Sequence, residues 1–239
     1  MKKRIESVFA ILLVLIIILD MNFYLKKDKT SQRQNTIKVV DKNKEKDLKD
    51  RIESYQKKYN NKDIVAQLII EDLEINTLIT KSKDNQYYLN HDLAGKESAL
   101  GNAFIDFRND LPLKDERQIN IYSHNSDYDS YREKLPFYKL ENYLEKKKFD
   151  SSKNVYLYTK EKKLEYEVYA VKIITNDNEH TVLDSNDDTR WNQHLKKLLT
   201  DTKYCKGNCA LDNNDKLLIL QTCNYQPRNS YILLILKKI

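Results

Sequence analysis

The spacing of apolar residues divides the chain into an N-terminal helical part and a longer part made mostly of strands. Short runs rich in β-branched and aromatic residues recur from residue 63 to the C-terminus. We predict strands over residues 64–70, 76–80, 86–89, 103–107, 119–122, 155–159, 164–174, 216–222 and 231–237. Many short strands with few helices are typical of a closed or nearly closed barrel, so the predicted fold is mainly β.

Three stretches have the spacing of helices. An amphipathic helix is predicted over about residues 44–60, because apolar side chains recur there every three or four positions at Leu48, Ile52, Tyr55 and Tyr59. We expect its apolar stripe to lie against the domain that follows. Two further helices are predicted as insertions among the strands. They cover residues 135–147 and residues 189–199.

The N-terminal segment is the most apolar part of the chain. An uninterrupted apolar run covers residues 8–19 and can be extended to residues 5–25 across polar positions that include Asp20 and Asn22. The shorter run suits a signal-peptide core, whereas the longer one reaches the roughly 20 residues that a membrane span needs. No small-x-small cleavage site follows, so we expect an uncleaved membrane anchor. Basic residues flank it on both sides, and the positive-inside rule therefore leaves its orientation open.

The composition changes again after this segment. Residues 26–45 are polar and rich in lysine, which is typical of a tether. The predicted organisation is a membrane anchor over residues 1–25, a tether with the amphipathic helix over residues 26–62, and a β-rich domain over residues 63–239. A chain of 239 residues can hold one domain of that size plus such appendages.

The charge pattern does not indicate a polyanionic partner. Charged residues make up 33% of the sequence, the net charge is +6, and the two signs are interspersed. There is no basic stripe with interleaved aromatic residues, which argues against nucleic-acid binding.

The three cysteines fall into a close pair and a single residue. Cys205 and Cys209 could close a small disulfide loop, contribute two metal ligands or remain loop thiols. No second cysteine pair or nearby histidine completes a zinc site of the usual spacing, so we expect no metal and no cofactor. Outside the cell, the odd count would leave one free thiol.

Cys223 and His124 each follow a predicted strand. The apolar run over residues 217–222 leads into Cys223, and the run over residues 119–123 leads into His124. A thiol and an imidazole are the minimum equipment for covalent thiol catalysis. A free cysteine is, however, often just a small buried hydrophobic residue, and the strand pattern alone favours that role.

His124 is the best of four candidate partners for the thiol. His91 lies in a turn-like Asn-His-Asp, His180 in a polar loop, and His194 on a predicted helix. His124 alone stands at the end of a strand. It would stabilise a thiolate as an imidazolium or give a proton to the leaving amine.

Four short motifs resemble those of sortases, the cell-wall transpeptidases of Gram-positive bacteria, and they follow one another along the chain in the order expected for that family. Residues 220–223 (Leu-Gln-Thr-Cys) resemble the Leu-x-Thr-Cys signature, and residues 122–125 (Tyr-Ser-His-Asn) resemble the Tyr-x-His-Asn histidine motif. Further upstream, residues 87–92 (Tyr-Tyr-Leu-Asn-His-Asp) and 104–108 (Phe-Ile-Asp-Phe-Arg) are similar to class B members. The resemblance runs from about residue 64 to residue 239.

The resemblance implies a fold and a set of site residues. The expected fold is a sortase-like closed β-barrel of about eight strands, with an N-terminal helix and an inserted helix that borders the substrate groove. Cys223 would be the nucleophile and His124 its partner. Asn90, Tyr122 and Thr222 would line the groove for the peptide, although a turn, core or strand-end role fits each of them equally well.

The third catalytic position departs from the family pattern. Sortases use an arginine near the start of the last strand to stabilise the oxyanion, which is often the largest catalytic effect. Arg228 is the only guanidinium in that neighbourhood, but it comes earlier than expected, and Tyr231 stands roughly where the arginine usually falls. We expect Arg228 to turn back toward Cys223 and supply the charge, with Tyr231 in the groove as the alternative, weaker donor.

The function implied by the resemblance is a membrane-anchored, class B-like cysteine transpeptidase. Cys223 would cleave a sorting motif of secreted proteins, expected to be NPxTx-like, after threonine and pass the acyl chain to a peptidoglycan amine. The catalytic domain would lie outside the cell, facing the cell wall. Two alternatives stay open, namely a thiol protease that only hydrolyses and an inactive, membrane-tethered peptide-binding domain. Papain-like proteases place the nucleophile before the histidine, whereas here His124 comes first.

Overall fold

The computed structural model describes residues 46–175, 180 and 187–239. The predicted anchor (residues 1–25) and the predicted polar tether (residues 26–45) lie outside these residues. Within the described part, no helix has the length and apolar character that a membrane span requires.

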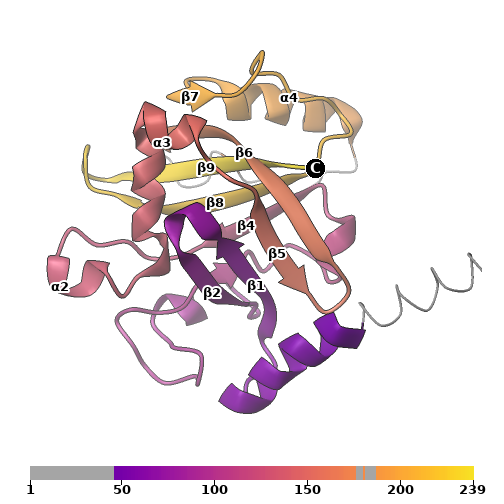
Figure 1. Cartoon of the computed structure of the whole chain (residues 1–239), viewed down its shortest axis with the longest axis vertical. Helices are drawn as coiled ribbons and strands as arrows, with labels where there is room; N and C mark the ends of the chain where they lie inside the picture. The colour runs from indigo at the N-terminus through magenta and orange to yellow at the C-terminus, as the bar shows by residue number, and fades with distance from the viewer. Residues whose placement is uncertain (1–45, 176–179, 181–186) are drawn as a thin grey trace, which may run out of the picture. The chain divides into compact units, whose positions relative to one another are not determined.

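The core of the molecule is a closed barrel. The described residues form one nine-stranded sheet in the order β5-β1-β2-β3-β4-β8-β9-β6-β7, and an additional β5–β6 pairing joins the first strand to the eighth (Figure 1). Eight strands therefore close into a barrel, and β7 extends the sheet beyond β6. The strands are β1 (Ile64–Ile70), β2 (Ile75–Thr80), β3 (Phe104–Ile105), β4 (Gln118–Tyr122), β5 (Val155–Thr159), β6 (Lys163–Ile174), β7 (Tyr204–Cys205), β8 (Leu217–Asn224) and β9 (Ser230–Lys238).

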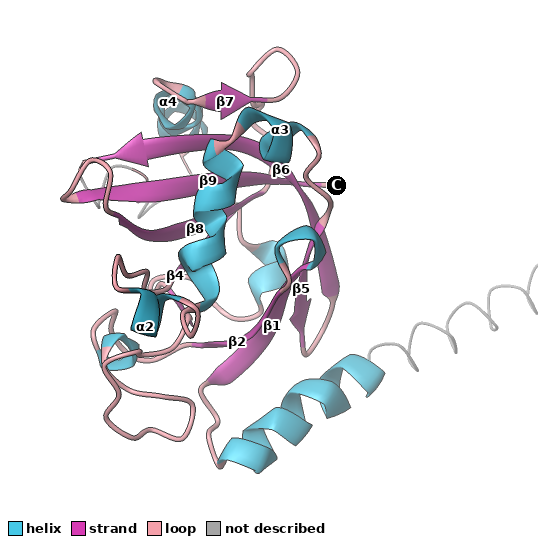
Figure 2. Cartoon of the chain, turned by 60° about the vertical axis from the view of Figure 1, so that its left-hand side comes forward, coloured by secondary structure: helices cyan, strands magenta, loops and turns pink. Residues whose placement is uncertain are grey.

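Helical segments cover the barrel at several places (Figure 2). The predicted amphipathic helix is confirmed over residues 46–59. Its Ile52 is fully buried, and Arg51 donates from Nε to Gln67 of β1 at 2.7 Å. The remaining helices are η1 (Glu71–Leu73), η2 (Tyr87–Leu89), η3 (Leu113–Asp115), α2 (Asp129–Arg132), η4 (Pro136–Leu144), α3 (Lys146–Asp150) and α4 (Asp188–Leu199), where η denotes a 3-10 helix.

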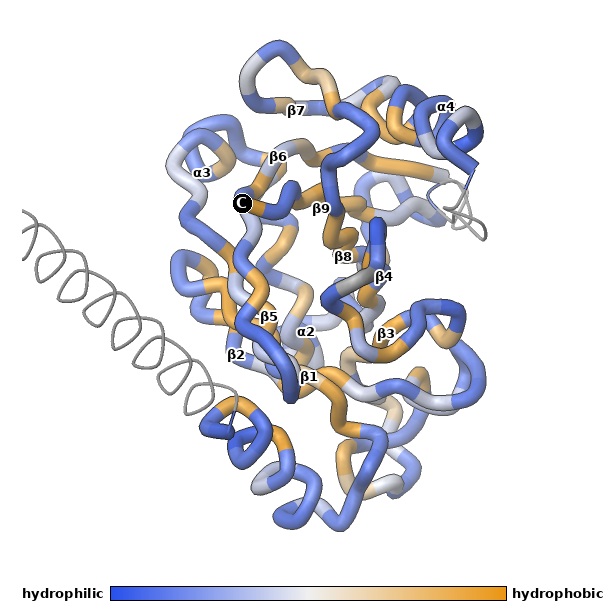
Figure 3. The backbone as a smooth tube through the Cα atoms, turned by 90° about the vertical axis from the view of Figure 1, so that its right-hand side faces the viewer, coloured by the Kyte–Doolittle hydropathy of each residue, from blue (hydrophilic) through white to orange (hydrophobic). Residues whose placement is uncertain are grey.

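Two apolar clusters lie on opposite faces of β8 and β9. Inward-facing residues such as Leu218 and Leu220 pack in the barrel interior together with residues of η4. The alternate residues of β8, such as Ile219, pack against α4, whose Trp191 and Leu195 are buried. Figure 3 shows the resulting hydrophobic character along β8 and β9. Both faces of these strands are covered along most of their length, which explains their nearly continuous apolar sequences.

Three predicted elements differ in the structure. The predicted strand over residues 86–89 is wrong, because the carboxylate of Asp84 accepts from the N–H groups of the next turn and winds it into η2. The strand over residues 103–107 is shortened to β3, since Arg108 folds back onto Asp106. The helix over residues 135–147 forms as η4 followed by the short α3.

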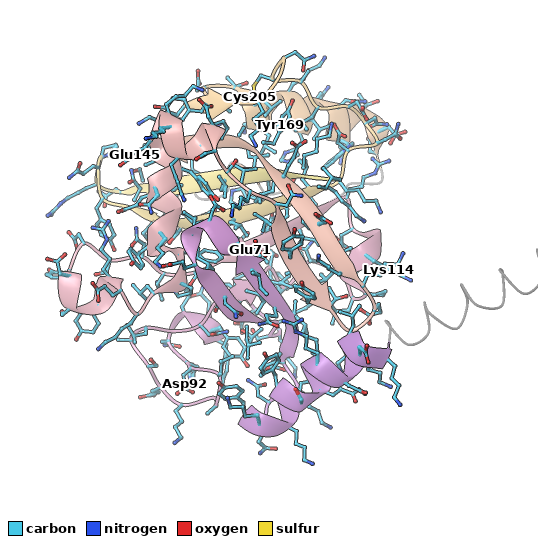
Figure 4. All side chains as sticks on the ribbon, in the orientation of Figure 1. Glu71, Asp92, Lys114, Glu145, Tyr169 and Cys205 are labelled. Carbon is cyan, nitrogen blue, oxygen red and sulfur yellow. A yellow bond between two sulfur atoms is a disulfide. The ribbon has the colours of Figure 1, made fainter. Side chains whose placement is uncertain are left out.

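Of the alternatives for the cysteine pair, the local disulfide is the one observed. Cys205 and Cys209 are bonded to each other, and Cys223 is free. The disulfide loop lies beside Tyr169, whose hydroxyl donates to the carbonyl of Ala210 at 2.6 Å (Figure 4). The pair is thus part of the structure around β6 and β7 and leaves Cys223 as the single titrating thiol of the chain.

Candidate active site

A cavity of about 360 Å³ opens at the C-terminal ends of β4 and β8. It is large enough to hold part of an extended peptide. The cavity contains the two residues that the sequence pairs for thiol chemistry, together with residues from η2, β3 and β9. Its lining consists of Asn85, Gln86, Leu89, Phe104, Arg108, Tyr122, Ser123, His124, Gln221, Thr222, Cys223 and Tyr231.

The parallel pairing of two strands brings Cys223 and His124 together. β4 runs parallel to β8, with Tyr122 opposite Gln221, so both strands end at the same edge of the sheet. Each functional residue comes two positions after that pair. Because parallel strands in register advance equally, the thiol and the imidazole emerge side by side at this edge.

Polar bonds tie the two strand ends to each other. The hydroxyl of Thr222 donates to the carbonyl of Ser123 at 2.8 Å, and the side-chain amide of Asn125 donates to the carbonyl of Cys223 at 3.1 Å. Thr222 is only 2% exposed, so its hydroxyl joins the strands and does not reach into the open part of the cavity. These bonds hold Cys223 and His124 in a fixed relation.

The hydrogen bond of His124 indicates which of its ring nitrogens carries the proton. Nε2 lies 2.6 Å from the carbonyl oxygen of Leu89 in η2. Because a carbonyl only accepts, this nitrogen is assigned the proton, and Nδ1 remains as the acceptor in the neutral ring. His124 can therefore accept a proton at Nδ1 without breaking its bond to the protein.

The thiol of Cys223 is half-buried, and burial raises its pKa above the ordinary value. Backbone hydrogen bonds involving Asn125 and Cys223 itself act in the opposite direction but do not cancel the effect. The resting side chain is therefore a neutral thiol near pH 7. Such a thiol needs a base to become nucleophilic.

Arg228 does not reach this cavity. Its side chain is 83% exposed, and its nearest described charge partner is Asp127, with Nη2 3.9 Å from Oδ2. The loop before β9 is bound to itself instead, since Asn224 donates to the carbonyl of Gln226 and to the hydroxyl of Ser230. The expectation that Arg228 turns back toward Cys223 is thus not what the structure shows.

Tyr231 takes the position beside Cys223. In the antiparallel β8–β9 pair it lies directly opposite Cys223, so both side chains project from the same face of the sheet. Tyr231 also lines the cavity. Tyr231 comes three positions after Arg228 and lies within β9, whereas Arg228 stays in the connecting loop.

Of the remaining predicted groove residues, Tyr122 lines the cavity and Asn90 does not. Tyr122 lines the cavity and donates its hydroxyl to Asp106 at 2.7 Å. Asn90 is exposed at the end of η2, where its side chain lies 2.8 Å from Nδ1 of His91. Asn90 and His91 are absent from the lining of this cavity.

The other two histidines also lie outside the cavity lining. His194 of α4 bonds to Gln118 at 2.8 Å, and burial lowers its pKa to about 4. It is therefore neutral and structural at physiological pH. His180 is fully buried, with its ring 5.9 Å from that of Tyr122.

A polar cluster of Asp106, Arg108 and Tyr122 borders the same cavity, and sequence reasoning assigned no role to its two charged residues. Arg108 binds the carboxylate of Asp106 through Nε at 2.7 Å and through Nη2, and Tyr122 binds the same carboxylate. Burial alone would raise the pKa of Asp106, but these bonds, chiefly those from Arg108, lower it to about 2. The signal was present as the Asp-x-Arg spacing in residues 106–108, but its structural consequence depends on the turn after β3.

Comparisons with known proteins agree with this arrangement. A family model described as a sortase domain matches residues 68–235. Sortase B of Listeria monocytogenes is 30% identical over 178 residues, which are 74% of this chain and 69% of that protein.

Solved structures are similar over most of the described domain. Sortase B of Clostridium perfringens superposes with a TM-score of 0.69 at 26% identity, covering 78% of this chain and 99% of that one. Sortase B of Staphylococcus aureus, solved as a complex with substrate, has a TM-score of 0.68 at 24% identity, covering 80% and 85% of the two chains. At that identity the second likeness concerns the fold alone.

Proposed function

The chain belongs to the sortase family of cysteine transpeptidases, and from this premise we propose that Cys223 is its nucleophile and His124 its general acid and base. The observation that carries the proposal is the parallel register of β4 and β8, which sets the free thiol beside the imidazole in one cavity. Nδ1 of His124 is the free acceptor that a neutral thiol requires.

Acylation follows from these two groups. Nδ1 of His124 takes the proton of the Cys223 thiol while the sulfur attacks the carbonyl carbon of the peptide, and the carbonyl electron pair moves to oxygen. When the oxyanion collapses, the C–N bond breaks and the leaving amine takes the proton from His124. The peptide is then held as a thioester on Cys223.

Deacylation is the reverse reaction with a different amine. The incoming amine attacks the thioester carbonyl, loses a proton to His124, and expels the sulfur, which regains that proton. A new amide replaces the old one, and no oxidant, metal or cofactor enters the balance. Water in place of the amine would give hydrolysis.

We assign the oxyanion donor to the hydroxyl of Tyr231 in place of Arg228. Support comes from its position opposite Cys223 and from the outward direction of Arg228. A neutral hydroxyl is a weaker partner for a developing negative charge than a guanidinium. We therefore expect slower acylation than a site with a charged donor would allow.

The substrate and the location are assigned by analogy with the family. The proposed substrate is an NPxTx-like sorting motif of secreted proteins, cleaved after threonine, and the proposed acceptor is a peptidoglycan amine. We propose that residues 1–25 anchor the protein in the cell membrane with the catalytic domain facing the cell wall. Staphylococcus aureus sortase B, which shares this fold, has been solved with a substrate.

The test is a transpeptidation assay with the full chain in detergent. NPxTx-like peptides are incubated with and without triglycine as the amine, and products and the thioester on Cys223 are followed by mass spectrometry. The Cys223→Ala variant should lose both cleavage and thioester. The matched control, Cys205→Ser with Cys209→Ser, should retain turnover because that disulfide lies outside the cavity.

Each result has a distinct meaning. A transpeptide supports the proposal, whereas hydrolysis that ignores triglycine indicates a protease. Peptide binding without thioester indicates an inactive binding domain. Turnover by Cys223→Ala, with loss in the double variant, would refute the assignment of the nucleophile.

A further inference from the structure

The register of β4 and β8 ends before the two residues proposed for catalysis. The last pair in register is Tyr122 with Gln221. The histidine segment (residues 123–126) and the cysteine segment (residues 222–225) follow, and no backbone-to-backbone hydrogen bond joins these two described segments. The distance between the imidazole and the thiol therefore depends on bonds that side chains make from one segment to the other.

Two hydroxyl groups of the cysteine segment hold the peptide groups on both sides of His124. Before the histidine, the carbonyl of Ser123 accepts from the hydroxyl of Thr222 at 2.8 Å. After it, the carbonyl of Asn125 accepts from the hydroxyl of Tyr225 at 2.8 Å. The backbone of the histidine is thus bound at two points by residues that flank the thiol in the sequence.

Asn125 returns the contact from Tyr225 to the cysteine segment. Its side-chain amide donates to the carbonyl of Cys223 at 3.1 Å, and its Oδ1 accepts from the N–H of Ser126 at 2.8 Å. Asn125 is 6% exposed, so water has little access to these bonds. Together with the bond from Tyr225 they close a ring between the two segments, and such a connected network restrains its members more than single bonds would.

A second contact between the same parts of the chain is weaker. Nη2 of Arg228 lies 3.9 Å from Oδ2 of Asp127, and the arginine side chain is 83% exposed. Solvent screens an exposed ion pair at this distance, so it contributes little. The hydroxyl of Tyr225 bonds at 2.8 Å to a buried residue, and it is therefore the stronger link from the loop before β9 to the histidine segment.

We propose that Tyr225 is a positioning residue for the reaction assigned to Cys223 and His124, and the proposal rests on that proposed function. Its hydroxyl keeps the carbonyl of Asn125 in place, and with it the imidazole one residue earlier, at the distance from which Nδ1 takes the proton of the thiol. Tyr225 is absent from the lining of the cavity, so this role requires no contact with a peptide there. The ring nitrogen Nε2 is held separately by Leu89, so loss of the hydroxyl would shift the histidine without freeing it.

The first test separates positioning from binding, with the full chain in detergent. Tyr225→Phe removes only the hydroxyl, and it should lower kcat roughly tenfold with KM within about twofold, because a small misplacement slows the chemical step without changing the groove. Tyr128→Phe is the matched control, since Tyr128 is 71% exposed and its hydroxyl makes no hydrogen bond to a described residue. An unchanged kcat in Tyr225→Phe, or an equal loss in the control, would overturn the proposal.

The second test determines whether the hydroxyl acts through His124. Single-turnover thioester formation is followed by mass spectrometry in His124→Ala, with and without Tyr225→Phe. Once the imidazole is absent, removing the hydroxyl should change the residual rate by less than about twofold, because the two groups act as a unit. A tenfold loss in both backgrounds would show that the hydroxyl acts on the thiol or the oxyanion itself and would contradict the positioning role.

The third test measures the position without any turnover. His124→Cys places a second thiol beside Cys223, on a neighbouring strand at about 4.8 Å, which a disulfide can span. The chain also carries Cys205→Ser and Cys209→Ser, so that no other thiol takes part. In a glutathione redox buffer, the equilibrium constant for the new disulfide should fall about tenfold when Tyr225→Phe is added, and it should stay within about twofold in the Tyr128→Phe control.

The outcomes are separable from those of the proposed function. If the unmodified chain forms the transpeptide and Tyr225→Phe does so equally fast, the positioning role is wrong and the sortase assignment stands. If the unmodified chain forms no thioester, the proposed function fails and the disulfide equilibrium decides. An unchanged equilibrium constant in Tyr225→Phe would then refute the positioning role, whereas the tenfold fall would support it. Thermal unfolding verifies that each variant is folded.

Discussion

The two faces of β8 have different roles, although they belong to one strand. On the inner face, Leu218 and Leu220 are fully buried in the barrel, and Thr222 ends the row with its hydroxyl bonded to the next strand. On the outer face, Ile219 is covered by α4, but Gln221 and Cys223 reach the cavity. Strand alternation alone therefore separates residues that hold the barrel from residues that do chemistry.

The difference between the faces lies in what covers them. On the inner face, Leu218 and Leu220 pack in the barrel interior, and the hydroxyl of Thr222 is paired with the carbonyl of Ser123. On the outer face, Trp191, Leu195 and Leu198 of α4 cover only the first half of β8, where Leu217 and Ile219 lie. Beyond that cover, Oε1 of Gln221 is buried without a hydrogen-bond partner in the described part of the chain.

The largest effect on catalysis is expected from removing the imidazole of His124, which lies at the end of β4 beside the outer face of β8. His124→Ala should lower kcat by roughly 10²–10⁴-fold, as expected for a lost general acid and base. Its described side-chain bond is to the carbonyl of Leu89 at the cavity edge, so the melting temperature should change little. The measurement is steady-state transpeptidation, with His91→Ala as the control outside the lining. A change confined to KM would assign His124 to binding instead.

The inner face should respond in stability and not in chemistry. Leu220→Ala removes a fully buried side chain from the barrel and should destabilise the protein by about 2–5 kcal/mol. Because the side chain points away from the cavity, kcat per folded molecule should stay close to that of the wild type. Denaturant unfolding and active-site titration of the thiol measure the two quantities. A large loss of kcat in a fully folded Leu220→Ala variant would contradict the assignment of stability to the inner face and of chemistry to the outer face.

The two candidates for the oxyanion donor give the next largest effect. Tyr231→Phe should reduce kcat by roughly 10²-fold, the lower end of the range for a lost oxyanion donor, because a neutral hydroxyl is the weaker kind. Arg228→Ala, at an exposed loop position, should stay within about threefold of the wild type. Single-turnover acylation compares them. The reverse order would return the role to Arg228.

The smallest effect concerns the pH dependence of the thiol. Because burial raises the pKa of Cys223, its alkylation by iodoacetamide should still rise about tenfold per pH unit as the pH approaches 9. In denaturant the rate should level off earlier, near the ordinary thiol pKa of about 8.5. A folded-state plateau below pH 8 would instead reveal a resting thiolate–imidazolium pair.

Much of the architecture could be read from the pattern of apolar residues. β1 and β5 have the predicted bounds, and β8, β9 and α4 differ by one or two residues at their ends. The failures lie where a side chain bonds to the backbone nearby. The carboxylates of Asp84 and Asp106 accept from nearby backbone N–H groups and wind or end segments whose composition favours strands, because a local hydrogen bond outweighs β-propensity in short runs.

The sequence by itself determined that a thiol and an imidazole stand at the ends of two strands, in motifs that resemble one family. Only the tertiary structure decided which polar residues join them. The parallel pairing of β4 with β8 set His124 beside Cys223, and the length of the loop before β9 brought Tyr231 opposite the thiol while Arg228 stayed outside. Gln221 and Arg108 are 113 positions apart (221 − 108), and they line one cavity because β3, β4 and β8 are neighbours in the sheet. Local sequence encodes the direction of a side chain from its own strand, but the neighbour it meets depends on strand pairing over long distances.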